Sequence, residues 1–136
     1  MKTAIEAFRE DDPVIVVAMR MRDVGTGFVP ICDVHGHPAG TVTDHDIVST
    51  VCADDRLASR TLVGEIMDRD LVTCYADDDL AVAEERMDHS HRARVLVLDR
   101  RQKLVGVLSL ADLFRTEEDR RALNSARQIV EREYLA

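Results

Sequence analysis

The chain has few of the residues on which whole classes of protein depend. It contains no tryptophan and three cysteines, an odd number scattered along 136 residues and embedded in apolar or strand-like segments. A disulfide framework needs paired cysteines at regular spacing, so we expect reduced thiols that pack as small buried apolar side chains. They are Cys32, Cys52 and Cys74.

Long apolar segments and an excess of positive charge are also missing. No apolar run approaches the roughly 20 residues that span a bilayer, and the first residues lack the apolar core of a secretory signal. Acidic residues outnumber basic ones by 26 to 18, for a formal net charge of −8. Non-specific binding to nucleic acid or to an anionic membrane depends on clustered Lys and Arg, so neither is expected. The sequence favours a cytoplasmic protein.

Signatures of catalysis and of metal binding are weak. The chain has no phosphate-binding glycine loop and no Ser/His/Asp or Cys/His pairing with motif support, so no catalytic residue is predicted. Two His-x-His pairs, His35 with His37 and His89 with His91, can chelate, yet neither has the partner spacing of a structural zinc site. We expect a solvated turn and a helix end there, with a weak metal sensor as a lesser alternative.

One pattern occurs twice in the chain. Thr43 to Ile47 and Ser109 to Leu113 each contain a hydroxyl residue, two variable residues, an aspartate and an aliphatic residue, and the two copies lie 66 positions apart. The same offset pairs apolar, aspartate and glycine positions elsewhere in the two halves. With 46% apolar residues, the chain can supply one core for two such halves. We therefore predict a tandem of two similar units.

Periodicity predicts the same order of elements in both halves. The first half is expected to form strand 4–8, helix 13–23, strands 28–32 and 39–42, and helix 43–52. The second is expected to form a short lead-in helix 61–67, strand 71–75, helix 80–88, strands 95–98 and 104–108, and helix 109–115. The resulting organisation is a first repeat at 1–55, a linker and lead-in at 56–65, a second repeat at 66–116 and a C-terminal helix at 117–136.

Acidic residues at helix starts and a charged tail complete the pattern. Asp12 is expected to cap the helix that begins at Pro13, and the run Asp77 to Asp79 to cap the helix at 80–88, because Asp is favoured there. A calcium loop would also need a glycine and a distal glutamate. The tail places Leu123, Ala126, Val130 and Tyr134 along one helical stripe. This stripe must pack on the chain's own core, a second subunit or a partner.

The repeated motif has two interpretations. A hydroxyl residue that opens a helix after a strand lies beside unpaired backbone N–H groups, which favour an anion such as phosphate. An aspartate three residues later can accept two hydrogen bonds from the vicinal hydroxyls of a ribose. The same spacing is also typical of a capping box, which needs no ligand. The spacing leaves both interpretations open.

Each half resembles a CBS domain, and the tandem resembles a Bateman module. The resemblance covers nearly the whole chain to about residue 115. The segments that carry it are 27–33 (GFVPICD), 40–47 (GTVTDHDI), 66–67 (IM), 94–99 (RVLVLD) and 104–113 (LVGVLSLADL).

The resemblance implies an α/β (α+β) fold of two pseudo-twofold related βαββα repeats that regulate rather than catalyse. It implies an adenosine-containing ligand, such as AMP, ADP or ATP, in clefts between the repeats, with no cofactor required. It also implies a homodimer and a regulated enzyme or transporter as partner. The implied ligand-binding residues are Thr43 and Ser109 at phosphate, Asp46 and Asp112 at ribose, Phe28, Val29, Pro30, Arg94, Val95 and Leu96 around the base, and Ile5, Ala7, Val72 and Thr73 at the adenine edge.

Three positions depart from the family pattern. His45 occupies a position where the family often has arginine, which makes the phosphate contact of the first repeat weaker or pH-dependent. In the second repeat, Leu96 replaces a frequent proline, and Leu110 replaces the acid found at Asp44. A ligand-free assembly domain, with Thr43 and Ser109 acting only as helix caps, is the alternative from a different class.

Overall fold

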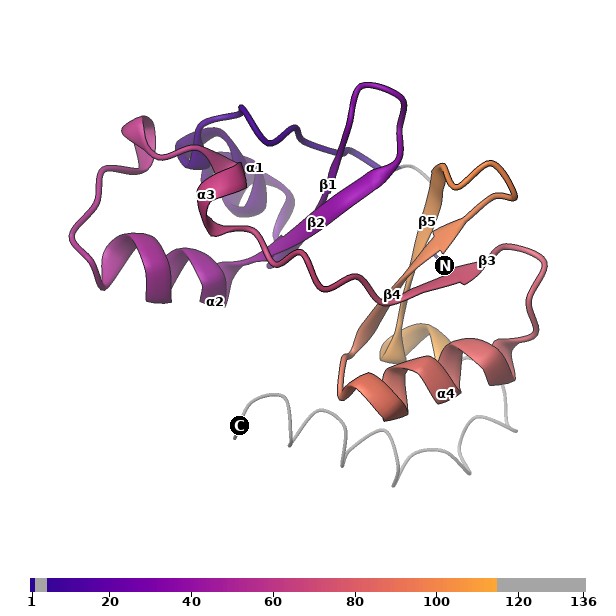
Figure 1. The fold of residues 1–136 in the computed structure, drawn as a ribbon. Helices are drawn as coiled ribbons and strands as arrows, with labels where there is room; N and C mark the ends of the chain where they lie inside the picture. Colours follow the sequence, from indigo (N-terminus) through magenta and orange to yellow (C-terminus); the bar gives the residue numbers. More distant parts are fainter. Residues whose placement is uncertain (2–4, 115–136) are drawn as a thin grey trace. The chain divides into compact units, whose positions relative to one another are not determined.

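The computed structural model describes residues 1 and 5–114, with the side chains of residues 113 and 114 left aside. The chain divides into two compact units, which are described separately (Figure 1). The first unit is Glu6–Leu71, and the second contains, of the described residues, Met1, Ile5 and the chain from Val72 to Phe114. The predicted C-terminal helix at 117–136 lies outside the described residues.

The first unit packs one helix against a two-stranded antiparallel sheet. Its core contains the apolar face of the helix, Val14, Val17 and Met21, together with Val29 and Ile31 from the sheet. Spacings of three and four residues place the three helix residues on one face, and strand alternation does the same for the two sheet residues. The elements are α1 (Val14–Val24), β1 (Phe28–Cys32), β2 (Pro38–Thr43), α2 (Asp44–Ile47), a π-helical turn (Val48–Cys52), a 3₁₀ turn (Ala58–Arg60) and α3 (Val63–Ile66).

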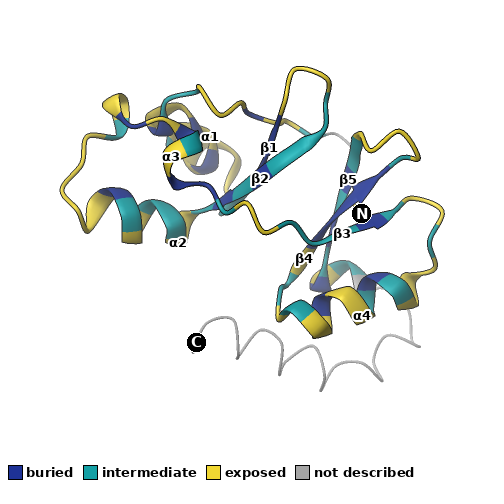
Figure 2. Ribbon diagram, viewed as in Figure 1, coloured by how far each residue is buried: buried dark blue, intermediate teal, exposed yellow. Residues whose placement is uncertain are grey.

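The second unit repeats this plan with one more strand. Its sheet has the order β3-β4-β5, in which β3 runs parallel and β5 antiparallel to the central strand. The central strand is buried along most of its length (Figure 2), and it contributes Val95 and Val97 to the core beneath the helix. The elements are β3 (Thr73–Tyr75), α4 (Leu80–Ser90), β4 (Arg94–Leu98), β5 (Leu104–Ser109) and a 3₁₀ turn (Leu110–Phe114).

The offset of 66 residues found in the sequence is also the structural offset. Phe28 pairs with Thr43 in the first sheet, and Arg94 pairs with Ser109 at the equivalent place in the second. Both hairpins have an irregularity in register at the same point of the repeat. The duplicated, mixed helix-and-strand fold is therefore confirmed, and the predicted bounds of β1 match those observed.

Some predicted elements form differently. The strand expected at 4–8 is reduced, within the described residues, to one parallel bridge between Phe8 and Ile31. The helix expected at 43–52 is a short α-helix followed by a π-helical turn. There the hydroxyls of Ser49 and Thr50 bond to the carbonyls of His45 and Asp46, so side chains replace part of the α-helical ladder. The segment expected to form a helix after Ser109 forms a 3₁₀ turn up to Phe114.

The aspartates before the two helices do not cap them as predicted. The side chain of Asp12 accepts a hydrogen bond from the Arg9 N–H at 2.8 Å, and Asp78 accepts one from the Tyr75 N–H at 2.8 Å. Neither α1 nor α4 has a side-chain hydrogen bond at its N-cap. In both repeats the carboxylate accepts its hydrogen bond within the turn before the helix.

The segment expected to lead into the second repeat packs with the first unit. Val63 is fully buried, and with Ile66 it belongs to the core of the first unit. The backbone N–H of Val63 donates to the Asp12 carbonyl at 2.8 Å. An apolar pattern predicts that a helix must be covered, but it does not say which neighbour covers it.

All three cysteines are free thiols, as expected. Cys32 and Cys74 are buried, and burial raises the pKa of both thiols. Cys52 is exposed at the end of the π-helical turn, so the expectation of burial was wrong for this residue. In the described part of the chain, no helix is both long enough and apolar enough to cross a membrane.

Candidate functional site

The repeated motif of the first unit forms a capping box where β2 passes into α2. The hydroxyl oxygen of Thr43 accepts a hydrogen bond from the Asp46 N–H at 3.1 Å. In return, Oδ2 of Asp46 accepts one from the Thr43 N–H at 2.9 Å. Both side chains thus satisfy backbone donors that the start of a helix leaves unpaired. The capping interpretation of this motif is realised in the structure.

Capping does not exhaust what this carboxylate can do. Within residues 5–114, no hydrogen bond uses Oδ1 of Asp46, and the residue is only half-buried. A carboxylate has about four acceptor sites on its two oxygens, so one backbone donor leaves capacity for further donors. The motif is therefore a helix cap that still presents an acceptor oxygen and a hydroxyl at one point of the surface.

In the second unit, the same motif forms a different set of hydrogen bonds. Oδ2 of Asp112 accepts hydrogen bonds from the Ser109 N–H at 2.8 Å and from the Ser109 hydroxyl at 3.1 Å. The terminal ammonium of Met1 lies 3.6 Å from Oδ1 of Asp112, whose side chain is 13% exposed. Both oxygens of this carboxylate therefore already have partners within the unit.

Strand register places a different residue beside each hydroxyl. Cross-strand partners in an antiparallel sheet have neighbouring side chains on one face, so Phe28 lies beside Thr43 and Arg94 beside Ser109. Phe28 is half-buried, whereas Arg94 is exposed. The first repeat thus has an aromatic residue across the strands from its hydroxyl residue, and the second has an arginine.

The side chain of Asp44, in the motif of the first unit, lies close to the backbone of Gly27. A Cβ on Gly27 would lie 2.7 Å from Oδ2 of Asp44, so the carboxylate packs directly over the glycine. The Asp44 N–H donates to the Gly27 carbonyl at 2.9 Å, and the Leu110 N–H donates to the Ala93 carbonyl at the same distance. The backbone is shared between the repeats, but the acidic side chain occurs only in the first. This contact was not found from the sequence, because residues 27 and 44 belong to separate elements.

Several residues expected around the base are buried. Val29 and Val95 belong to the two cores, where they are 4% and 1% exposed. Leu96 is 1% exposed, and Pro30 is buried as well. The Leu96 N–H donates to the Val72 carbonyl at 2.9 Å. A ligand would reach these four residues mainly through their backbone.

The remaining predicted residues differ in how far they are exposed to solvent. His45 and Ala7 are exposed, whereas Ile5, Val72 and Thr73 are half-buried. Ile5 groups with the second unit and Ala7 with the first, although the two were expected to serve one adenine edge.

Arg100, in the turn between β4 and β5, forms contacts with the chain before α4. Arg100 donates two hydrogen bonds to Asp77, at 2.8 and 3.1 Å, and its guanidinium lies 4.1 Å from the ring centre of Tyr75. The hydrogen bonds from Arg100 lower the pKa of the Asp77 carboxyl. This arginine thus joins the turn between β4 and β5 to the turn before α4.

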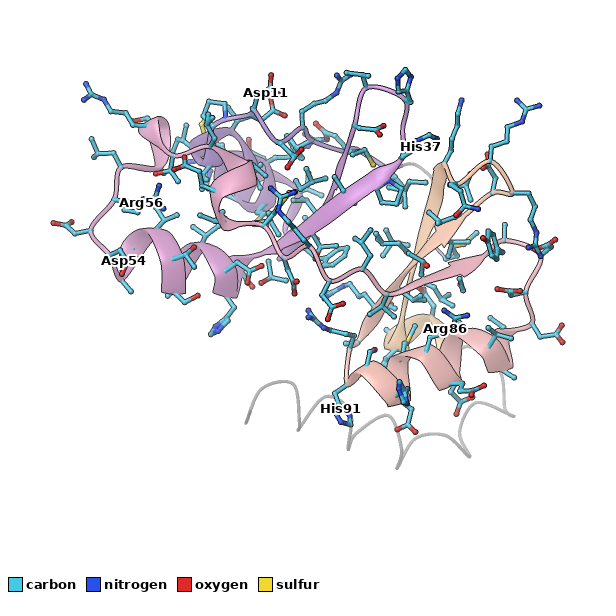
Figure 3. The ribbon with its side chains drawn as sticks, in the orientation of Figure 1. Asp11, His37, Asp54, Arg56, Arg86 and His91 are labelled. Atoms are coloured by element: carbon cyan, nitrogen blue, oxygen red, sulfur yellow. The ribbon has the colours of Figure 1, made fainter. Side chains whose placement is uncertain are left out.

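The histidine pairs lie in a turn and at a helix end. His37 is in the turn between β1 and β2, 3.5 Å from the Asp33 carboxylate, and His91 follows the end of α4 (Figure 3). The rings of His35 and His37 are tilted, with their centres 6.2 Å apart. Among the described residues, no group of three or more His, Cys, Asp or Glu side chains is placed to hold a metal ion.

Two relatives cover most of this chain but only part of their own length. The uncharacterized protein MK0525 of Methanopyrus kandleri is 25% identical over 103 residues, which are 76% of this chain and 53% of that protein. The uncharacterized protein MJ1404 of Methanocaldococcus jannaschii is 28% identical over 106 residues, which are 78% of this chain and 25% of that protein. The chain thus spans about half of one relative and a quarter of the other.

Three solved structures share the fold. The CBS domain protein PAE2072 of Pyrobaculum aerophilum, complexed with AMP, has a TM-score of 0.79 at 22% identity, covering 92% of this chain and 95% of that one. Hypoxic Response Protein I with two coordinated zinc ions has 0.76 at 25% identity, covering 85% and 92%. The cytosolic domain of the Mg²⁺ channel MgtE in complex with ATP has 0.70 at 22% identity, covering 82% and 44%.

The family model agrees with the duplication. A CBS domain matches residues 1–52, and a second match covers residues 63–119. Each match contains one copy of the hydroxyl-x-x-Asp motif, together with the hairpin that ends in it. The chain belongs to the CBS domain family, as a tandem of two such domains.

Proposed function

We propose that the protein is a non-catalytic regulatory module that binds an adenosine-containing ligand, such as AMP, ADP or ATP. In this proposal, binding is transmitted to a partner enzyme or transporter. The observation that carries it is the hydroxyl-carboxylate motif, which recurs at the same strand register in both units. Membership of the CBS family, whose proteins are generally regulatory, and the AMP and ATP complexes of two structural neighbours support it.

The chemistry of the first repeat suits a nucleoside. Oδ1 of Asp46 would accept hydrogen bonds from the ribose hydroxyls, since Oδ2 is bonded to the Thr43 N–H. The Thr43 hydroxyl would contact phosphate, and His45, exposed in the first turn of α2, would add positive charge when protonated. The ring of Phe28 would stack on the base, a contact worth about 1–3 kcal/mol for bases on aromatic side chains.

The second repeat would bind phosphate more strongly and ribose less readily. Arg94 is exposed and pairs across the strands with Ser109, and its guanidinium would bind a phosphate group there. The Asp112 carboxylate would first have to give up its contacts with the Ser109 hydroxyl or with the ammonium of Met1.

Calorimetric titration with AMP, ADP, ATP, NAD and S-adenosylmethionine tests this function. Alanine at Asp46 would remove the helix cap together with the ligand contact, so Asp46→Asn with Asp112→Asn is the sharper variant. An asparagine oxygen still accepts from the backbone N–H, but the charge is lost. Asp33→Asn with Asp99→Asn is the matched control, because each also removes one turn carboxylate from each repeat. Equal affinity in all three proteins would refute the assignment of these carboxylates to ribose.

One observation supports the second candidate function, assembly into a homodimer. The exposed side of α1 is apolar, with Ile15, Val16, Met19 and Val24 all at least 37% exposed. The equivalent of Met19 on α4 is Glu85, which is the residue expected on a solvated helix. An apolar helix face of this kind is typical of a protein–protein contact.

Light scattering coupled to size exclusion measures this assembly. We expect Met19→Glu, which copies the residue of the second repeat, to reduce the dimer fraction of the protein. Glu85→Gln alters the equivalent position of α4 and should leave the mass unchanged. A dimer that persists in the Met19→Glu variant would show that α1 is not the contact.

A further inference from the structure

In the first unit, a second segment of chain lies along the start of α1. The backbone N–H of Val14 donates to the Thr61 carbonyl, and the N–H groups of Val63 and Gly64 donate to the carbonyls of Asp12 and Glu10, each at 2.8 Å. Three bonds of this kind fix both the direction and the register of the segment. The result is a backbone contact that runs from Thr61 into the first turn of α3.

Burial in the first unit depends on this contact. Val14 and Val63 are both 0% exposed, and Thr61 is buried beside them. A Cβ on Gly64 would lie 3.1 Å from the Cβ of Glu10, so the two backbones approach closely. The start of α1 and the Thr61–Gly64 segment thus bury each other.

The second unit has the same surface without a described segment over it. The equivalents of Val14, Asp12 and Glu10 are Leu80, Asp78 and Ala76, since the offset of 66 holds throughout the turn and the helix. Within residues 5–114, the Leu80 N–H and the carbonyls of Asp78 and Ala76 make no backbone hydrogen bond. Leu80 is 56% exposed, where Val14 is completely buried.

We infer that residues 117–136 of the same chain dock on this surface, at the start of α4. The sequence of this segment carries the apolar stripe of Leu123, Ala126, Val130 and Tyr134, which must be covered. The 3₁₀ turn Leu110–Phe114, which immediately precedes the segment in the chain, packs against α4 (Figure 1). The segment is therefore tethered beside the surface, at a high effective concentration.

The surface and the segment differ in their pattern of charge. The surface around Leu80 is acidic, with Asp79 and Glu85 exposed and Glu84 half-buried. The segment contains four arginines and five acidic residues among its twenty residues, so the apolar stripe, and not charge, selects this surface. These arginines are Arg120, Arg121, Arg127 and Arg132.

Hydrogen–deuterium exchange, read by mass spectrometry, tests the docking in the full chain and in a chain that ends at Thr116. We expect amides of residues 76–82 to exchange at least ten-fold faster in the shortened chain. The amide of Val14, which donates to the Thr61 carbonyl in both proteins, is the internal control. A peptide of residues 117–136 added to the shortened chain should restore the protection.

A point substitution keeps the test valid if the shortened chain does not fold. Leu80→Ser in the full chain should increase exchange at 76–82 and within 117–136, whereas Ala81→Ser, at the next exposed position of α4, should not. Unchanged exchange at 76–82 in both the shortened chain and the Leu80→Ser variant would overturn the inference. Protection that disappears on dilution would overturn it as well, because the occupant would then be the segment of a second copy.

Discussion

The two repeats share a backbone and differ in what their side chains do with it. Asp33 and Asp99 each close the hairpin turn of their repeat, with hydrogen bonds from two backbone N–H groups at 2.8–3.0 Å. The motif carboxylates differ, because Asp46 keeps an oxygen without a partner in the described chain, whereas Asp112 meets both Ser109 and Met1. Backbone hydrogen bonds define the repeat, and side chains distinguish one repeat from the other.

The largest expected difference between the repeats concerns the ligand. We expect Asp46→Asn to weaken adenosyl-ligand binding by about ten- to a hundred-fold, because a charged acceptor of ribose hydroxyls becomes neutral, a loss of about 1.4–2.7 kcal/mol. Asp112→Asn should weaken binding less, since its carboxylate is already engaged within the unit. Calorimetric titration of both single variants measures the ranking. The reverse order would mean that the second repeat supplies the main ribose contact.

The residues in the left-handed conformation at the ends of α1 and α4 should differ by about 1 kcal/mol in their contribution to the free energy of unfolding. Gly25 ends α1 with a φ of 76°, and His91 ends α4 with a φ of 57°. A residue with a Cβ in this conformation loses about 1 kcal/mol relative to glycine. We expect His91→Gly to raise, and Gly25→Ala to lower, the free energy of unfolding by about that amount. Urea denaturation measures both, and His89→Gly, inside α4, should be destabilising and so controls for a general effect of glycine.

A smaller difference concerns the acidic side chain over Gly27. We expect Gly27→Ala to destabilise the protein by about 0.5–1 kcal/mol, because the added Cβ displaces the Asp44 carboxylate from its hydrogen bond with the His45 N–H. In an Asp44→Leu background, which copies Leu110 of the second repeat, the same substitution should cost almost nothing. A double-mutant cycle measures this coupling. Additive effects would show that the alanine clashes with the backbone instead.

Sequence patterns predicted the parts of the structure that depend on local chemistry. The bounds of β1 and the end of α1 at Gly25 follow from apolar runs and from a glycine in the left-handed region. The capping box at Thr43 follows from spacing alone. The packing of Val63 into the first unit does not, because any apolar surface can cover an apolar residue. The contact of Met1 with Asp112 joins residues that are far apart in the sequence, and no local pattern encodes it.

The smallest expected difference concerns acid stability, where the two repeats should behave alike. Hydrogen bonds from the backbone N–H groups of His37 and Lys103 lower the pKa of the Asp33 and Asp99 carboxyls, respectively. A carboxyl whose pKa is lowered in the folded state stabilises the protein at pH values above its ordinary pKa of about 3.9. This contribution is lost as the pH falls from that value through the lowered pKa of the folded state. Asp33→Asn and Asp99→Asn should each flatten the fall in melting temperature between pH 5 and pH 3 by a similar, small amount. Ser90→Asn, which changes no charge, is the control. If only one variant flattens the profile, the two turns are not energetically equivalent, and the matching hydrogen bonds of the two repeats do not carry equal weight.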